Sequence, residues 1–418
     1  MRTQPIFYLR KMKIIKNSFL WVITAALSVA FSFELGLGES LGKIFIPLCV
    51  VSCFALAHKK LKIKYIEYLL FFSISITSLF GLTQTLTGSH AESNNILLFG
   101  LSFYTASIAY LIAIKSFNFS KIFDVSNPLL LFTGPIALFI KPIKHKKINN
   151  RIKYYFPFII IGSFMFLVVG SPLTEFFYLI NRTDVVSSIL FAGIFEIFVY
   201  MNFCGLSLFI YGLFGVLGYR IPLNFKQPFS SSNIIEFWRG WHISLSQVLK
   251  VLFYKRLRAK FSLFITLVGV YVASAMWHGI TLNFFIWGLF HAILFWLSLQ
   301  LMKLGKGFLP LLMMPIIIVI GRLIFADSDT ERLTQKLFFN FDGFDGAFSI
   351  LTAPTNSHIS LIFGLCLIFV EFAFRKTRVM HNRNYKHLRS PFVSCVLCIL
   401  GIILISNVGV DYAVYGQR

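Results

Sequence analysis

The sequence predicts an all-α, polytopic membrane protein with about eleven transmembrane helices, plus re-entrant and interfacial helices. Composition is the first reason: 57% of the 418 residues are hydrophobic, only 13% are charged, and the mean hydropathy is +0.77. Such values lie far outside the range of soluble proteins. Long apolar runs recur along the chain, and Lys and Arg gather in short clusters between them. Residues 1–418 are therefore expected to form one integral-membrane domain.

The apolar runs give the predicted helices in chain order. The run 126–140 contains Pro128 and Gly134-Pro135 and has basic residues on both sides, so it is expected to re-enter rather than cross. The run 186–217 is too long for one straight span and predicts a tilted or broken helix. The predicted spans lie near 18–36, 43–57, 65–83, 96–114, 155–172, 186–217, 261–277, 284–302, 308–325, 359–373 and 391–407.

The distribution of charge predicts the orientation. Basic clusters alternate with the less basic, acid-containing loops 84–95, 173–184 and 326–358, which places the N-terminus on the cytoplasmic side. The net charge of +23 follows these clusters, so it reflects topology and does not indicate a nucleic-acid partner. The six cysteines lie in or beside apolar stretches and are expected to be compact apolar residues.

A polar, aromatic block interrupts this pattern. Residues 238–296 contain five of the six Trp and three of the nine His. Asn233 and Glu236 have the spacing of a capping box, which predicts a helix start. On one continuous helix, Trp238, Trp241, His242 and Leu245 would share a face. Basic residues at 250–260 follow, so this helix is expected to lie along the cytoplasmic interface.

His278 ends a nearly apolar run and is the strongest catalytic candidate. No Asp, Glu, Lys or Arg lies between residues 261 and 302, so the imidazole is expected to stay neutral and to accept a proton as a general base. The alternative is a core histidine bonded to a backbone carbonyl. Nearby aromatic and polar residues favour a functional site: Trp277, Asn283, Trp287 and His291. His291 is expected to have a supporting or structural role.

Other chemistries are less favoured. His242, His278 and His291 match no zinc spacing, and few carboxylates lie nearby, so no metal is predicted. The sequence contains no phosphate-binding loop, no nucleophile elbow and no dinucleotide fingerprint.

The block resembles the membrane-bound O-acyltransferase family, and most closely its bacterial branch of alginate O-acetylases and teichoic-acid D-alanyl transfer proteins. The resemblance covers roughly residues 97–300. It is carried chiefly by Phe237-Trp238-Arg239-Gly240-Trp241-His242-Ile243-Ser244-Leu245-Ser246, Trp277-His278-Gly279 and Trp287-Gly288-Leu289-Phe290-His291. Weaker similarity includes Gly100-Leu101-Ser102-Phe103-Tyr104 and Gly134-Pro135-Ile136.

This resemblance implies a function. A thioester donor on the cytoplasmic side, acetyl-CoA or an acyl carrier protein, would give its acyl group, most simply acetyl, to hydroxyls of a cell-surface polysaccharide. No bound cofactor is implied. His278 and His242 would be the catalytic residues, and the substrate-binding residues would be Trp238, Trp241, Trp277, Asn283, Trp287 and His291. An extracytoplasmic esterase-like or acyltransferase partner, the bilayer of the bacterial cytoplasmic membrane, and funnels meeting near His278 are also expected.

Two alternatives remain open. The first is D-alanyl transfer from a carrier protein to teichoic acid or a similar polymer. The second is a transporter or channel without enzymatic activity. The lack of an internal repeat speaks against a transporter, as does an expected lack of acidic residues within the membrane.

Overall fold

The computed structural model describes residues 38–79, 91–143, 147–180, 184–305, 308–326, 333–334, 345–375 and 389–405. Most of these residues are helical, so the predicted all-α class is confirmed. The chain divides into two compact units, one containing residues 1–142 and 220–222, the other residues 143–219 and 223–418. Two short strands, β1 (Lys141–Pro142) and β2 (Tyr219–Arg220), lie where the chain passes from one unit to the other. The predicted span 18–36 falls outside the described residues.

The first unit is built around one apolar helix. This helix, α5, packs against α2, α3 and α7, and the hydroxyl groups of Tyr104 on α5 and Ser52 on α2 are 2.5 Å apart. The run 126–140 forms only the short helix α7 followed by non-helical chain. Helix α7 is too short to cross a bilayer, in agreement with the prediction. The helices are α2 (Gly38–Leu61), α3 (Ile66–Leu79), α5 (Ala91–Ala113), α6 (Phe119–Val125) and α7 (Pro128–Thr133).

The second unit contains the longest apolar helices. Four helical stretches among the described residues are long and apolar enough to cross a membrane: Ile148–Leu179, Val185–Leu217, Leu282–Lys303 and Thr355–Ala373. Six shorter helical stretches are also apolar: Leu48–His58, Ile66–Thr77, Gly100–Ala113, Leu263–His278, Leu309–Phe325 and Pro391–Leu404. These helices coincide with most of the predicted spans, while the total of about eleven remains a prediction.

The two longest stretches are not regular throughout. The first runs from α8 (Ile148–Ser163) through π-helix η1 (Phe164–Gly170) and 3-10 helix η2 (Ser171–Thr174) to α9 (Glu175–Leu179). The second runs from α10 (Val185–Val199) through π-helix η3 (Tyr200–Cys204) to α11 (Gly205–Leu217). A π-helical turn inserts an extra residue and re-aims the side chains around it. The run 186–217 thus forms one continuous helical stretch with a π-helical segment and no break, and its tilt remains a prediction.

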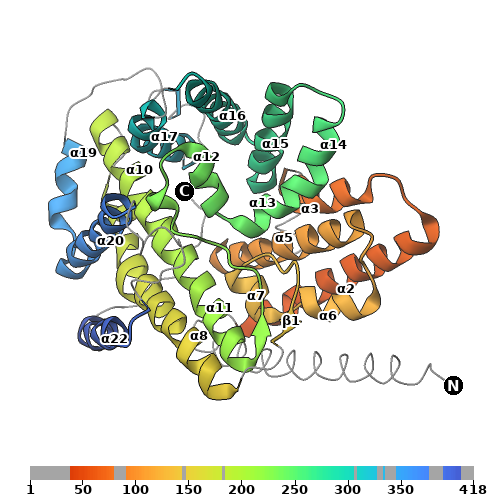
Figure 1. Ribbon diagram of the computed structural model, residues 1–418, viewed down its shortest axis with the longest axis horizontal. Coiled ribbons are helices and arrows are strands. Elements are labelled where there is room, and N and C mark those ends of the chain that lie inside the picture. Colours follow the sequence, from red (N-terminus) through yellow and green to blue (C-terminus); the bar gives the residue numbers. More distant parts are fainter. Residues whose placement is uncertain are drawn as a thin grey trace. The chain divides into compact units, whose positions relative to one another are not determined.

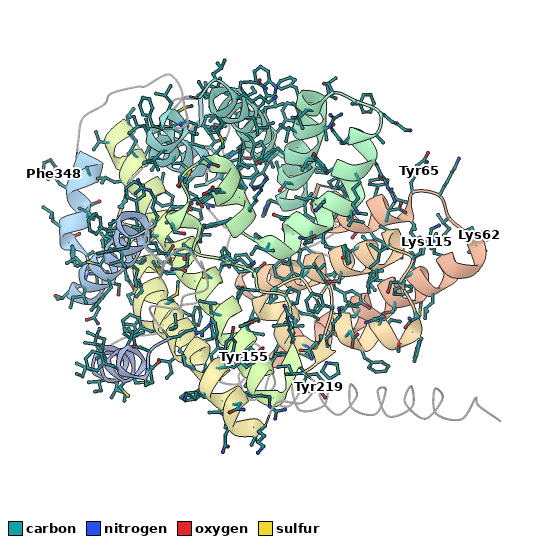
Figure 2. All side chains as sticks on the ribbon, in the orientation of Figure 1. Lys62, Tyr65, Lys115, Tyr155, Tyr219 and Phe348 are labelled. Atoms are coloured by element: carbon teal, nitrogen blue, oxygen red, sulfur yellow. The ribbon has the colours of Figure 1, made fainter. Side chains whose placement is uncertain are left out.

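Glycines bring α8 and α11 unusually close. A Cβ atom on Gly205 would lie 2.8 Å from both the Gly162 carbonyl oxygen and the Phe166 backbone nitrogen. Near the other end of the contact, the Tyr155 ring, labelled in Figure 2, covers Gly215 and leaves no room for a side chain there. Close helix contact through small residues is a common way to pack helices in a membrane, where the hydrophobic effect does not drive association.

The rest of the second unit carries the polar block and the helices around it. In Figure 1, α15 and α16 run side by side, and α16 also packs against α17. The elements are η4 (Pro228–Ser230), α12 (Ile234–Gly240), α13 (Ile243–Leu249), η5 (Lys250–Tyr254), α14 (Lys255–Arg258), α15 (Leu263–His278), α16 (Leu282–Lys303), α17 (Leu309–Phe325), α19 (Asp345–Phe348), η6 (Ser349–Thr352), α20 (Thr355–Ala373) and α22 (Pro391–Ile405).

Candidate functional site

The polar block begins with the predicted helix start. The side-chain oxygen of Asn233 accepts a hydrogen bond from the backbone N–H of Glu236 at 3.0 Å, so the predicted cap is confirmed. The Glu236 carboxylate bonds the backbone N–H of Ser232 at 3.1 Å, one residue before the position that a capping box would use. Two donors at the start of α12 are satisfied in this way.

The prediction of one continuous helix is wrong. Helix α12 ends at Gly240, Trp241 is extended, and His242 adopts a left-handed conformation (φ 42°, ψ 56°) before α13 begins at Ile243. Trp238, Trp241, His242 and Leu245 therefore do not share one helix face. The helix is interrupted because residues 240–244 bond to a segment about twenty residues upstream. These hydrogen bonds replace those that a continuous helix would make.

Asn224 makes that contact. Its carbonyl oxygen accepts a bond from the Ile243 N–H at 2.8 Å, and its side-chain oxygen accepts bonds from the N–H and hydroxyl of Ser244 at 3.3 and 2.8 Å. Next to it, the Lys226 N–H donates to the Gly240 carbonyl at 2.9 Å. These bonds open the helix at Trp241 and turn the His242 side chain away from the α12 face.

His242 is the N-cap of α13. Its Nδ1 accepts a bond from the Leu245 N–H at 3.3 Å, so Nε2 carries the proton of the neutral ring. The ring is buried, 4.9 Å from the Phe203 ring centroid and 6.2 Å from that of Trp277. Burial, as the largest cause, and the nearby His278 together lower the pKa of His242 to about 3. The neutral His242 is therefore a hydrogen-bond donor through Nε2.

His278 is the last residue of α15, and it is half-buried. Its ring contacts the rings of Phe284 on α16 and Phe325 on α17, with centroid distances of 6.0 and 5.1 Å, and these two rings also contact each other at 4.9 Å. A Cβ atom on Gly279 would lie 2.7 Å from the Phe284 ring, so this glycine lets the α16 ring reach the imidazole. Three helices thus fix the position of His278.

Trp277 joins the two motif histidines. The centroid of its buried ring is 6.2 Å from that of His242 and 4.9 Å from that of His278. The structure therefore brings together the two residues predicted to be catalytic, although 35 residues lie between them in the sequence.

His291 sits in an aromatic enclosure on α16. Its Nδ1 lies 3.0 Å from the Trp287 carbonyl oxygen, an acceptor, so Nδ1 carries the proton. The rings of Trp287, Trp238 and Tyr271 surround it at 4.3, 5.3 and 6.2 Å. These contacts favour the structural role that the sequence suggests for His291.

Three other predicted binding residues occupy different positions. Trp238 contacts Trp287 at 5.7 Å, and its buried Nε1 has no hydrogen-bond partner among the described residues. Trp241 packs instead against the rings of Tyr200, Phe225, Phe229 and Phe237, and Phe237 in turn contacts Trp238. Asn283 donates to the carbonyl oxygens of Ile324 and Phe325 at 3.4 and 3.2 Å, which ties α16 to the end of α17.

The prediction that the membrane segments lack acidic residues is wrong. Glu196 on α10 and Glu371 on α20 are both buried. Glu371 accepts a bond from the Tyr200 hydroxyl at 2.8 Å, and Glu196 pairs with Arg322 on α17. His278 also has a charged neighbour after all, because Arg322 interacts with it electrostatically. Glu196, Arg322 and Glu371 are each a single charged residue inside an apolar run, and this pattern could have predicted their importance from the sequence.

The described residues contain no group of three or more His, Cys, Asp or Glu side chains arranged to hold a metal ion. Within this part of the chain, His242, His278 and His291 contact aromatic rings, and His242 and His291 also contact backbone groups. The described site therefore consists of two candidate histidines, His242 and His278, held among aromatic rings.

Comparison with known proteins agrees with this architecture. Residues 108–325, just over half of the chain, match the model of the membrane-bound O-acyltransferase family. A probable alginate O-acetylase of Pseudomonas aeruginosa is 32% identical over 154 residues, covering 34% of this chain and 29% of the relative.

Two further relatives differ in their named substrates. A teichoic acid D-alanyltransferase of Bacillus subtilis is 26% identical over 151 residues, covering 32% of this chain and 38% of the relative. A peptidoglycan O-acetyltransferase of Helicobacter pylori is 38% identical over 100 residues, covering 23% of this chain and 18% of the relative. The chain thus spans well under half the length of these relatives. The family match contains both motif histidines, the helices that hold them and Arg322, and on this basis the chain belongs to the membrane-bound O-acyltransferase family.

Proposed function

We propose that this protein transfers an acyl group, most simply acetyl, from a cytoplasmic thioester to hydroxyl groups of a cell-surface polysaccharide. The carrying observation is that His242 and His278 both contact Trp277, inside an apolar helical unit. Membership of the family supports the reaction class. The relatives named for alginate, peptidoglycan and teichoic acid support a polymeric acceptor.

The two imidazoles suit different tasks. His278 accepts the proton of the acceptor hydroxyl while the hydroxyl oxygen attacks the thioester carbonyl carbon. The carbon–sulfur bond then breaks, and the leaving thiolate takes the proton from His278, which yields an ester and a free thiol. His242, with its proton on Nε2, and Trp238, with its buried N–H, supply hydrogen bonds to the reacting oxygens.

The donor and the location are part of the same proposal. Acetyl-CoA or an acyl carrier protein brings the thioester from the cytoplasm, with the protein in the bacterial cytoplasmic membrane. Funnels that meet near His278 give the donor and the acceptor access from opposite sides. An extracytoplasmic esterase-like partner passes the acyl group on when the acceptor lies beyond reach of the membrane.

D-alanyl transfer is the second candidate, and the similarity to the Bacillus subtilis D-alanyltransferase favours it. It uses the same site, with a carrier-bound D-alanyl thioester as donor. The expected lack of acidic residues within the membrane was one argument against a transporter, and the buried Glu196 removes it. The experiment must therefore distinguish a transporter from an acyltransferase.

The test uses purified protein in nanodiscs. Labelled acetyl-CoA and a labelled D-alanyl carrier protein are offered with unacetylated alginate, peptidoglycan or teichoic acid, and ester formation is measured. We expect His278→Ala to lower turnover by about 100- to 10,000-fold at unchanged monodispersity, because a general base typically contributes that much. His58→Ala, in the first unit, is the matched control and should retain turnover. A parent protein that transfers nothing from either donor would favour the transporter.

A further inference from the structure

A buried ion pair lies beside the proposed active site. Nε and Nη2 of Arg322 on α17 both lie 2.6 Å from Oε2 of Glu196 on α10. The two side chains are 9% and 7% exposed. Removing two charges from solvent is costly, and apolar residues of similar volume often stabilise a fold equally well. The pair therefore needs an explanation beyond helix packing.

The pair reaches His278 through one aromatic ring. The Arg322 guanidinium carbon is 5.1 Å from the ring centroid of Phe325, and that ring meets the His278 ring nearly edge-on at 5.1 Å and 79°. On the other side, the guanidinium covers Phe195 at 5.5 Å, next to Glu196 on α10. A cation held over a ring restricts where that ring can move.

The end of α17 has two further attachments to α16. Asn283 bonds the carbonyl oxygens of Ile324 and Phe325, as described above. A Cβ atom on Gly321 would collide with the His291 ring, so the helices touch directly at this level. The ion pair supplies the corresponding attachment to α10. Together these contacts fix Phe325 from both neighbouring helices.

We propose that the Glu196–Arg322 pair is a positioning device for His278. By joining α17 to α10, it holds Phe325 against the imidazole, and it places a fixed positive charge near the ring. This inference rests on the proposed function only for the role of His278 as a base. The position of the imidazole is a property of the folded protein with or without substrate.

The experiment separates positioning from folding. Arg322→Met and Glu196→Leu each leave one buried charge unpaired and are expected to destabilise the protein. The double variant Arg322→Met/Glu196→Leu removes both charges and should recover monodispersity. Arg322→Lys keeps the positive charge but lacks the planar guanidinium group. It replaces the double variant in the experiment if the double variant does not fold. Arg389→Met is the matched control, because Arg389 covers Tyr154 and Phe158 on α8.

Two readouts are taken on each variant. The first is acyl transfer with labelled acetyl-CoA or D-alanyl carrier protein. We expect kcat to fall at least about tenfold in the folded double variant, with donor KM changed less than about twofold, because displacing a reacting group by about 1 Å can cost a hundredfold. The second is the rate at which diethyl pyrocarbonate modifies His278, followed by peptide mass spectrometry with His242 as internal reference. We expect this rate to change at least about threefold in the double variant and in Arg322→Lys, and not in Arg389→Met.

The outcomes are distinct. Parental kcat and parental His278 modification in a folded double variant, or in Arg322→Lys, would overturn the proposal and leave the pair as a helix contact. If the parent protein transfers no acyl group from either donor, the proposed function fails, and the His278 modification rates alone decide whether the pair positions the ring.

Discussion

At the level of one residue, the structural role of His242 can be separated from its proposed catalytic role. Its backbone is in the left-handed region, and its imidazole Nδ1 caps α13. Asparagine tolerates this conformation and caps helices well, whereas alanine does neither. The pair of substitutions His242→Asn and His242→Ala therefore distinguishes a structural cap from a group that acts on substrate.

We expect His242→Asn to unfold at nearly the parental temperature, and His242→Ala to lose roughly 1 kcal/mol, the usual value of an N-cap. Both variants lack the Nε2–H donor, so both should lose most acyl transfer. Thermal unfolding and labelled acetyl-CoA turnover measured on the same preparations check this. Full turnover in His242→Asn would reduce His242 to a cap.

The lowered pKa of His242 also predicts a dependence of stability on pH. The folded-state pKa is about 3, below the value of about 6.5 in an unfolded chain. As pH falls below 6.5, the unfolded chain binds a proton that the native state does not, and stability on the order of 2 kcal/mol is lost by about pH 5. His242→Asn lacks this group, so its melting temperature should fall less than that of the parent between about pH 7.5 and 5. Parallel decreases in both proteins would contradict the assignment.

At the scale of elements, α8 and α11 depend on backbone contact. The two nearest atoms that would meet a Cβ on Gly205 are backbone atoms of α8 and η1, so they cannot rotate away as a side chain could. Gly193 on α10 has nothing within 4 Å of its own Cβ position. The two glycines are thus a matched pair with the same local cost of helix formation and different surroundings.

Gly205→Ala should separate α8 from α11 and destabilise the protein by about 1–3 kcal/mol, the range for overpacking a tight contact. Gly193→Ala should be neutral or slightly stabilising, since alanine favours helix over glycine by about 1 kcal/mol. Melting temperatures in one detergent give the comparison. Equal effects of the two substitutions would mean that the close contact does not limit stability.

At the scale of the whole molecule, the basic clusters predict the topology. The exposed Lys255, Arg256, Arg258 and Lys260 follow the polar block, whereas Glu175, exposed at the start of α9, belongs to the less basic segment 173–184. Cytoplasmic loops carry the excess of Lys and Arg, so the polar block and its basic tail are expected on the cytoplasmic side.

Single cysteines in a cysteine-free background test this orientation. A membrane-impermeant maleimide added to whole cells should label Glu175→Cys and leave Lys260→Cys unlabelled until the cells are opened. Ser246→Cys should behave like Lys260→Cys, because the segment between them is expected to lie along the interface without crossing. Labelling of Ser246→Cys and Lys260→Cys from opposite sides would overturn the predicted arrangement.

The sequence by itself determined the class of this protein, the approximate place of most helices and the candidate histidines. Hydropathy and the Asn233 cap depend on residues close together in the chain, so local patterns suffice to predict them. The broken helix at Trp241, the Arg322 charge near His278 and the aromatic enclosure of His291 could not be predicted in this way. Each depends on residues that only packing brings together: Asn224 with Ser244, Glu196 with Arg322, and Trp238 with His291. Long-range contacts of this kind override local helix preference, and the tertiary structure alone decides them.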